Sequence, residues 1–354
     1  MERDDYRKYT IYTLNGYPLK YRKHLRSLFV SAGIAQESGQ LSFSEPTAVD
    51  ISEYDDLDKQ LLSCIENDDK SLAIFEKWEF TKDYKYSVLF DADDFDRLYD
   101  LVSKNIPDFG EMSAPLFDVF INPRSLTHSD SIFLIKFNLK FEAIHPQTSE
   151  ELLVRYPVVV ALHKNEKIVE IRFDALKRFF MEKSDSFYAK LVEDVCHYFQ
   201  EKFQCKLTPL DMNFLIKRAQ DDMSDVRLIA QTMKMANGSY AQLEVGKNEE
   251  YVLPFIGELK NILSEYGAEF EKVPPLKEAF EQFIFEKETT SDYPWIELLW
   301  ENEIKTRSIH VKFTFNYYQK GYCLLQHYFN NTLIGMERMD HVVKFIDETR
   351  RNPQ

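Results

Sequence analysis

Apolar and polar residues alternate most regularly in the middle of the chain. Apolar side chains occupy every second position from Phe133 to Ala143, and polar side chains, Lys136 and Lys140 among them, lie between them. This pattern predicts an antiparallel strand with one buried face and one face in water. Apolar runs at 152–162 and 169–173 predict two further strands, and Asp174 is expected to cap a short helix. Residues 131–181 therefore form a predicted unit of three strands and a helix.

A similar pattern returns near the end of the sequence. Runs at 295–304, 308–318 and 322–329 predict three strands, and 339–351 predicts a helix. In the middle strand Val311 and Phe313 are expected to face inward, while His310 and Lys312 face outward. Residues 294–351 are thus a second predicted unit of three strands and a helix.

The remaining segments predict helices more often than strands. We expect a short strand at 9–14, a hairpin that turns at Asn237-Gly238, and helices at 21–32, 54–78, 91–106, 187–203, 209–220 and 252–266. Strands that occur in runs favour an α+β fold with mostly antiparallel sheets, built as strand meanders followed by helices, after an acidic helical N-terminal segment. We expect an N-terminal domain over 1–120 and a larger domain over 121–354.

The composition predicts a globular protein with a large core. Hydrophobic residues make up 44% of the 354 residues, with 28 Phe and 20 Tyr. No apolar run approaches the roughly 20 residues that cross a bilayer, and the charged start lacks the apolar segment of a secretion signal. The four cysteines have no paired spacing, so we expect reduced thiols, a cytoplasmic location and no membrane partner.

Common catalytic signatures are missing from the sequence. It has only 10 glycines and contains no GxGxxG, GxxxxGK[ST], GxSxG or HExxH motif. Phosphate-cradling loops need glycine because the backbone must approach the ligand closely. We therefore expect neither a cofactor nor a bound metal.

Charge is distributed unevenly along the chain, whose formal net charge is −15. Residues 1–36 carry a net charge of +4, whereas residues 37–118 carry −14. Three interpretations of the acidic block remain open: a solvated helical segment, a surface that docks a basic protein or imitates nucleic acid, and a metal site. The candidate docking residues are Asp91, Asp93, Asp94 and Asp96.

Basic residues on two surfaces are candidates for binding nucleic acid or a protein partner. One is the predicted helix at 21–32, and the other is the outward face of the predicted strands; the residues are Lys20, Arg22, Lys23, Arg26, Lys136, Lys140, His310 and Lys312. The alternative is that both are ordinary solvated surfaces.

One constellation resembles the divalent-metal site of restriction-type nucleases. Asp292 precedes a predicted strand that ends in Glu303-Ile304-Lys305. The two acids would hold Mg²⁺, and the lysine would stabilise developing charge on a phosphate. This pattern predicts a nuclease as an alternative function.

The sequence as a whole favours a non-enzymatic binding or assembly subunit with one or more protein partners. Its content of Lys, Ile, Phe and Tyr points to a prokaryotic or mobile-element origin, and to a nucleic-acid-handling system such as antiviral defence. Direct nucleic-acid binding and homo-oligomerisation are the other expectations that the sequence leaves open.

Overall fold

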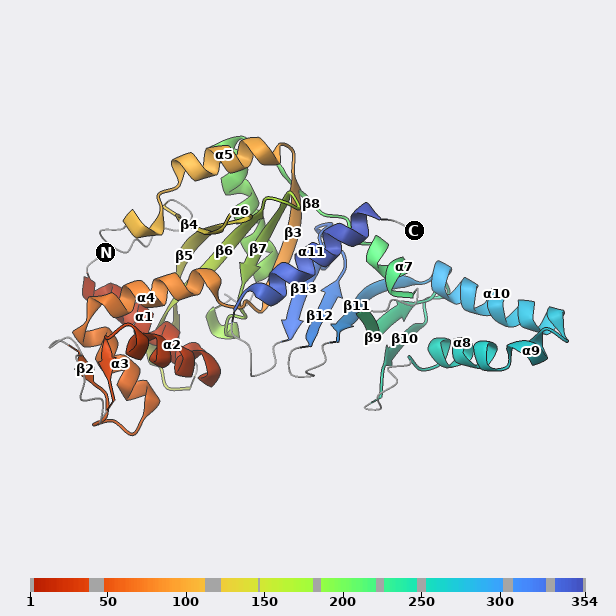
Figure 1. Ribbon diagram of the computed structural model, residues 1–354, viewed down its shortest axis with the longest axis horizontal. Coiled ribbons are helices and arrows are strands. Elements are labelled where there is room, and N and C mark those ends of the chain that lie inside the picture. Colours follow the sequence, from red (N-terminus) through yellow and green to blue (C-terminus); the bar gives the residue numbers. More distant parts are fainter. Residues whose placement is uncertain are drawn as a thin grey trace. The chain divides into compact units, whose positions relative to one another are not determined.

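The structure is a computed structural model that describes residues 3–37, 48–111, 122–145, 147–180, 186–220, 226–246, 253–301, 308–328 and 335–352 (Figure 1). It divides into two compact units. The first contains residues 1–208 and 334–343, and the second contains residues 209–333 and 344–354. Residues on both sides of the domain boundary expected at 120/121 fall in the first unit.

The first unit is built on an antiparallel sheet. Its strands are β3 (Tyr86–Ala92), β4 (Arg124–Ser129), β5 (Ile132–Ile144), β6 (Glu151–His163) and β7 (Ile168–Phe173), in the order β3-β7-β6-β5-β4. The short strand β8 (Leu207–Pro209) pairs with β3. The three strands expected between 131 and 181 are confirmed as β5, β6 and β7, whereas β3, β4 and β8 were not expected from the sequence.

Helices cover both faces of this sheet. Phe133 of β5 contacts Tyr99 of α5 (Phe95–Asn105), and Phe137 contacts Tyr198 of α6 (Phe187–Phe203). On the opposite face, the Lys136 side chain reaches Glu76 of α4 (Asp69–Thr81). The first half of β5 is consequently buried on both faces, and only its second half alternates between buried and exposed positions.

The N-terminal segment is helical. It contains α1 (Arg3–Gly16), α2 (Leu19–Ser31), α3 (Leu57–Asn67) and α4, with two short paired strands, β1 (Ala35–Gln36) and β2 (Val49–Asp50). Asp56 accepts a hydrogen bond from the Asp58 backbone N–H of α3, and Asp68 accepts one from the Lys70 backbone N–H of α4, as expected of helix caps. The acidic helices expected over 54–78 are therefore confirmed.

The strand expected at residues 9–14 is wrong, because these residues lie within α1. The Thr13 hydroxyl accepts a hydrogen bond from the backbone N–H of Arg155 (2.8 Å) and lies 3.0 Å from the Arg155 carbonyl oxygen. This part of β6 extends beyond the end of β7, so its backbone groups need another partner. Helix α1 supplies this hydrogen-bonding partner through the Thr13 hydroxyl.

Two expected helix starts are also wrong. Asp174 does not cap a helix, because it pairs with the buried Lys82 ammonium and accepts a hydrogen bond from the Lys85 backbone N–H (3.1 Å). A 3-10 turn, Arg178–Phe180, follows it. Thr208 and Pro209 belong to β8, and helix α7 begins later, at Phe214, and ends at Gln220.

The second unit contains its own antiparallel strands. They are β9 (Val226–Lys234), β10 (Tyr240–Glu244), β11 (Asp292–Trp300), β12 (Ile309–Thr314) and β13 (Leu324–Tyr328), in the order β10-β9-β11-β12-β13. The expected hairpin at Asn237-Gly238 is confirmed, with Gly238 at a φ of +81° that favours glycine. Between β10 and β11 lie the helices α8 (Ile256–Glu265), α9 (Gly267–Phe270) and α10 (Pro274–Thr290).

The last helix, α11 (Glu337–Arg351), contributes to both units, because the division falls after Val343. In the second unit its Phe345 ring packs edge-on against Trp300 of β11 (5.1 Å between ring centroids). The fold is α+β, as the sequence predicts, and the strand pairs β3-β7-β6-β5-β4 and β10-β9-β11-β12-β13 are antiparallel. The short strands β1 and β2 pair in parallel. None of the described helices has the length and apolar character needed to cross a membrane.

Candidate functional site

Lys136 was expected on a wet strand face, and this expectation is wrong because the side chain is buried. Its ammonium donates to the Glu76 carbonyl oxygen (2.7 Å), forms an ion pair with the Glu76 carboxylate, and lies 3.3 Å from a Glu79 oxygen. The reason is the position of α4, which covers the face of β5 that carries Lys136. The alternation of apolar and polar residues along a strand does not show whether a helix covers its polar face.

Lys136 belongs to a buried ionic network that also contains Glu76, Glu79 and Arg155. The Arg155 guanidinium lies 2.6 Å from Glu76 and 2.5 Å from Glu79. Burial alone would raise the pKa of Glu76, but the charges of Arg155 and Lys136 outweigh it and lower this pKa to about 2. Two carboxylates and two bases balance one another, so the network has no net formal charge. Tyr6, Tyr17 and Asn138 also donate hydrogen bonds to its carboxylates.

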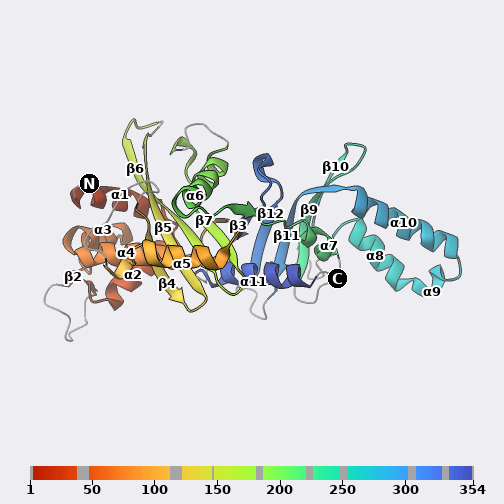
Figure 2. The same cartoon turned by 90° about the horizontal axis from the view of Figure 1, so that it is seen from above.

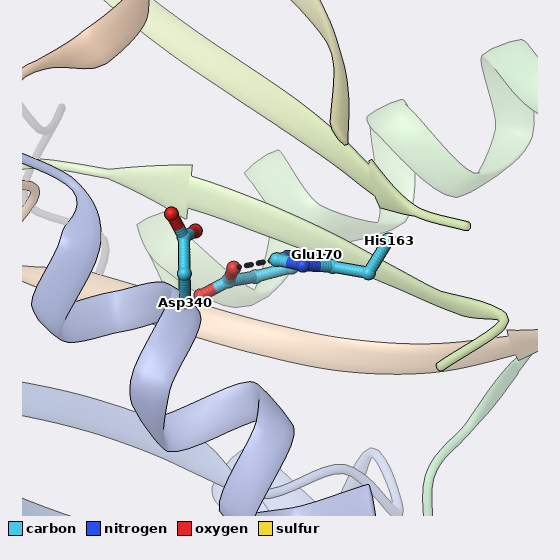
Figure 3. Close-up of side chains that lie close together, drawn as sticks. All are labelled: His163, Glu170 and Asp340. Carbon is cyan, nitrogen blue, oxygen red and sulfur yellow. Dashed lines mark hydrogen bonds and ion pairs between the residues drawn. The ribbon is translucent and has the colours of Figure 1, made fainter. Parts of the chain in front are cut away.

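A second charged group on the same sheet face has the residue types of a metal site. His163 of β6, Glu170 of β7 and Asp340 of α11 each offer one ligand atom, and these atoms all lie within 4.8 Å of one another. Figure 3 shows Glu170 joined to the His163 ring by a hydrogen bond (3.0 Å), with Asp340 entering from α11. Imidazole and carboxylate are suitable ligands for Zn²⁺.

Arg172 supplies the positive charge of this second group. One of its terminal nitrogens lies 2.6 Å from Glu170, 2.6 Å from Asp340 and 3.4 Å from the His163 ring nitrogen. Burial would raise the pKa of Glu170, but the neighbouring Arg172 charge holds it well below its usual range. A divalent cation would have to displace this guanidinium, so the group as it stands is an ionic contact between the sheet and α11.

The basic residues of α2 mostly pair with acids of the segment that follows. Lys20 lies 3.1 Å from Asp83, and Arg22 pairs with Asp58. Arg26 lies 2.7 Å from Glu37, whereas Lys23 is exposed. The opposite charges of residues 1–36 and 37–118 thus attract each other within the first unit.

The four candidate docking aspartates have local contacts in the structure. Asp94 caps α5 by accepting from the Arg97 backbone N–H (3.0 Å), and Asp93 accepts from the Cys205 thiol (3.0 Å). Asp96 pairs at the surface with Lys167 (2.6 Å), and Asp91 lies on β3 opposite Ile168.

The proposed nuclease residues are only partly described. Asp292 is exposed at the first position of β11, in register with Lys234 of β9. Glu303 and Lys305 lie outside the described residues. The nuclease site therefore stays a prediction.

The remaining basic candidates lie beside carboxylates. Lys140 is exposed near Glu142 (3.3 Å). His310 and Lys312 share Glu297 of the neighbouring strand, at 2.8 Å and 3.5 Å, and the Lys312 ammonium also lies 3.5 Å from the centroid of the Trp295 ring. Glu297 thereby reduces the positive charge of this strand face.

The clearest exposed feature was not expected from the sequence. Helices α8 and α10 lie side by side as an antiparallel hairpin joined by α9 (Figure 1, Figure 2). Seven large apolar side chains described on it are 45% to 72% exposed, Val273 and Phe285 among them. We call the other five the apolar hairpin face: Phe255, Ile262, Tyr266, Leu276 and Phe283. Exposed apolar side chains that cluster in this way mark interaction sites on soluble proteins.

Helical geometry places four of these residues, Ile262, Tyr266, Leu276 and Phe283, on one side of the hairpin, and Phe255 precedes the first turn of α8. An ion pair between Lys260 and Glu288 (2.7 Å) joins the two helices on the other side. At about 100° per residue, Ile262 points roughly 200° away from Lys260, and Phe283 roughly 140° away from Glu288. The α8 stripe (Ile262 and Tyr266) and the α10 stripe (Leu276 and Phe283) therefore point away from the ion pair. Phe285, three residues before Glu288, lies on the side of the ion pair.

Phe255 reaches the solvent from a strained backbone. Its φ is +63° and its ψ is −76°, and the Ile256 N–H donates to the Pro254 carbonyl oxygen (2.8 Å) to close a γ-turn around it. A γ-turn with positive φ is rare and costly for any residue with a β-carbon. The chain thus holds a 72% exposed aromatic ring at the start of α8 in an unfavourable conformation.

The hairpin could have been found in the sequence only in part. The 3.6-residue period predicts a helix over 252–266, and this is confirmed as α8. Each helix carries two apolar stripes: one packs against the other helix of the hairpin, and the other is exposed. The 3.6-residue period does not show which of the two stripes is buried. No known protein family matches the sequence, and no curated protein matches it significantly.

Proposed function

We propose that this protein is a binding or assembly subunit that docks a protein partner through the apolar hairpin face. The observation that carries the proposal is the exposure of Ile262, Tyr266, Leu276 and Phe283 on one side of α8 and α10, with the exposed Phe255 at the start of α8. Burying a half-exposed side chain of this size stabilises a complex by about 1 kcal/mol, and a few such residues dominate most interfaces.

Direct nucleic-acid binding has weaker support. Lys136 is buried, Lys20, Arg22 and Arg26 pair with acids, and His310 and Lys312 share a carboxylate. Such pairing reduces the charge that would attract phosphates. A cytoplasmic location and a role in a nucleic-acid-handling or antiviral system remain expectations from composition.

The experiment compares two substitutions two residues apart on α10. Phe283→Glu places a charge in the apolar hairpin face, whereas Phe285→Glu places the same charge on the other side of the same helix. Both side chains are exposed, so both variants should keep the free energy of unfolding within about 0.5 kcal/mol of the original. The chain is expressed in its native host with an affinity tag, and the proteins that co-purify stoichiometrically are identified by mass spectrometry.

The proposal predicts that a stoichiometric partner is retained by the original chain and by Phe285→Glu but is lost with Phe283→Glu. Recovery of the same partners with both variants would overturn it. Recovery of the chain without any stoichiometric partner, at its native expression level, would also overturn it.

A further inference from the structure

The charges around the apolar hairpin face are predominantly negative. Residues 255–290 contain eight glutamates and four lysines, with no aspartate or arginine. Lys260 pairs with Glu288 (2.7 Å), and Lys277 lies 2.6 Å from Glu271 and 3.8 Å from Glu281. Two of the four lysines are therefore engaged on the side of the hairpin that carries the ion pair between the helices.

Three glutamates border the apolar hairpin face itself. By helical angle, Glu258 and Glu265 lie within about 80° of the α8 stripe, and Glu286 lies within about 80° of the α10 stripe. All three side chains are exposed, and within the described parts of the chain none of them forms an ion pair. One lysine, Lys287, lies near this side, with its ammonium 5.3 Å from the centroid of the Phe283 ring. The face is apolar at its centre and acidic at its rim.

We infer that the partner presents a basic amphipathic helix, a conclusion that rests on the proposed docking function. Such a helix has apolar residues at spacings of three and four, which would pack between the stripes of α8 and α10. Lysines or arginines on both sides of its apolar stripe would meet Glu258, Glu265 and Glu286. Opposite charges at the rim of an interface select the partner and speed its association.

The negative charge of the rim also disfavours two other partners for this face, a second copy of the chain and nucleic acid. A second copy of the chain would bring the same acidic rim against itself, and each copy carries a formal net charge of −15. Like charges placed opposite one another cost free energy and slow association. Nucleic acid would face the same repulsion from its phosphates. A basic helix is the occupant that is complementary in both apolar character and charge.

The test uses the full chain and two designed helical peptides of roughly 20 residues, the length of a docking helix. The peptides share one leucine stripe, which lysines flank in one peptide and glutamates in the other. Binding is measured by fluorescence anisotropy at about 50 mM and about 200 mM salt. We expect the lysine peptide to bind at least about tenfold more tightly than the glutamate peptide, and to weaken as salt rises.

A charge-reversed chain provides the sharper control. The double variant Glu265→Lys, Glu286→Lys should shift the preference toward the glutamate peptide, because it reverses the sign of two rim charges. Glu258 is kept, because its carboxylate accepts a hydrogen bond from the Phe255 backbone N–H (3.1 Å) at the start of α8. Phe283→Glu should weaken the lysine peptide at least about tenfold, and Phe285→Glu should leave it unchanged.

The outcomes separate this inference from the proposed function. Equal binding of both peptides, lost with Phe283→Glu, would overturn the basic-helix inference and leave the docking surface in place. If Phe283→Glu does not change the affinity for either peptide, the inference is overturned. The co-purification experiment tests the docking function independently. A dimer in solution that Phe283→Glu converts to monomer would assign the face to a second copy and overturn the inference.

Discussion

The Arg155 guanidinium lies 2.5 Å from a carboxylate oxygen of Glu79, and neither side chain has any exposed surface. Arg155 comes from the middle of β6 and Glu79 from helix α4, so this contact fixes the helix over the sheet. Glu76 and Lys136 complete the network. Each charge in it is tolerated in the interior because the others are present.

Removing one base from this network should be strongly destabilising. Arg155→Met leaves two buried carboxylates with only Lys136 to balance them, and we expect the free energy of unfolding to fall by about 3–5 kcal/mol. Urea unfolding followed by circular dichroism measures this change. The control is Lys104→Met, which removes the partner of Asp100 from a pair whose side chains are more than 70% exposed; it should cost less than about 1 kcal/mol. Equal losses of unfolding free energy in the two variants would contradict the expectation that Arg155 balances buried carboxylates.

The stability of the protein should fall in acid over a defined range. The pKa of Glu76 is lowered from 4.5 to about 2 in the folded chain, because Arg155 and Lys136 outweigh the effect of burial. Between these values the unfolded chain binds more protons than the folded one, so stability rises with pH. This contribution is complete above about pH 4.5 and is lost as the pH falls toward 2.

Glu76→Gln tests the assignment of this pH dependence. The variant has no carboxylate to titrate at this position, so its stability should depend less steeply on pH between 4.5 and 2. The free energy of unfolding is measured at several pH values for both chains. Parallel curves would show that the acid sensitivity comes from other carboxylates.

The group of His163, Glu170 and Asp340 should respond to metal only when Arg172 is removed. In the original chain the guanidinium already pairs with both carboxylates, so added Zn²⁺ should not raise the unfolding temperature. Arg172→Met should be destabilised because Glu170 is left buried without its base, and Zn²⁺ should partly restore it. Restoration should disappear when His163→Phe is added. A Zn²⁺-dependent rise in the original chain that His163→Phe abolishes would contradict the role given to Arg172.

Phe255 should contribute more to the affinity for the lysine peptide than to the free energy of unfolding. Its positive φ strains the backbone, and glycine adopts such angles without that cost. Phe255→Gly should therefore keep or raise the free energy of unfolding, by up to about 1 kcal/mol, while it weakens the lysine peptide. Thermal unfolding and fluorescence anisotropy on the same preparation measure the two effects. A loss of stability together with unchanged peptide binding would show that the ring serves the fold instead.

Local patterns predicted much of the secondary structure. The alternation from Phe133 to Ala143 lies in β5, the valine-rich run 152–162 lies in β6, and the Asn237-Gly238 turn joins β9 to β10. Helix α6 has the bounds, Phe187 and Phe203, that the sequence predicts. These elements depend on hydrophobic period and turn chemistry, both of which are properties of short segments.

The errors occur where a distant residue decides the outcome. Residues 9–14 have the composition of a strand, yet they form a helix whose Thr13 bonds to the backbone of Arg155, 142 residues away. Asp174 is suited to capping a helix, yet Lys82 and the Lys85 N–H are its partners. In both cases a tertiary contact outweighs the local preference.

By itself the sequence determined the α+β class and the positions of most strands and helices, because period and turn residues act over a few neighbours. Only the tertiary structure decided which polar faces are covered and which apolar faces are left open. Lys136 and Phe283 show the difference: a lysine became buried because α4 brought two glutamates to it, and a phenylalanine stayed exposed because α8 packs on another side of α10. Burial depends on what lies opposite a side chain in space, and the order of residues along the chain does not specify this locally.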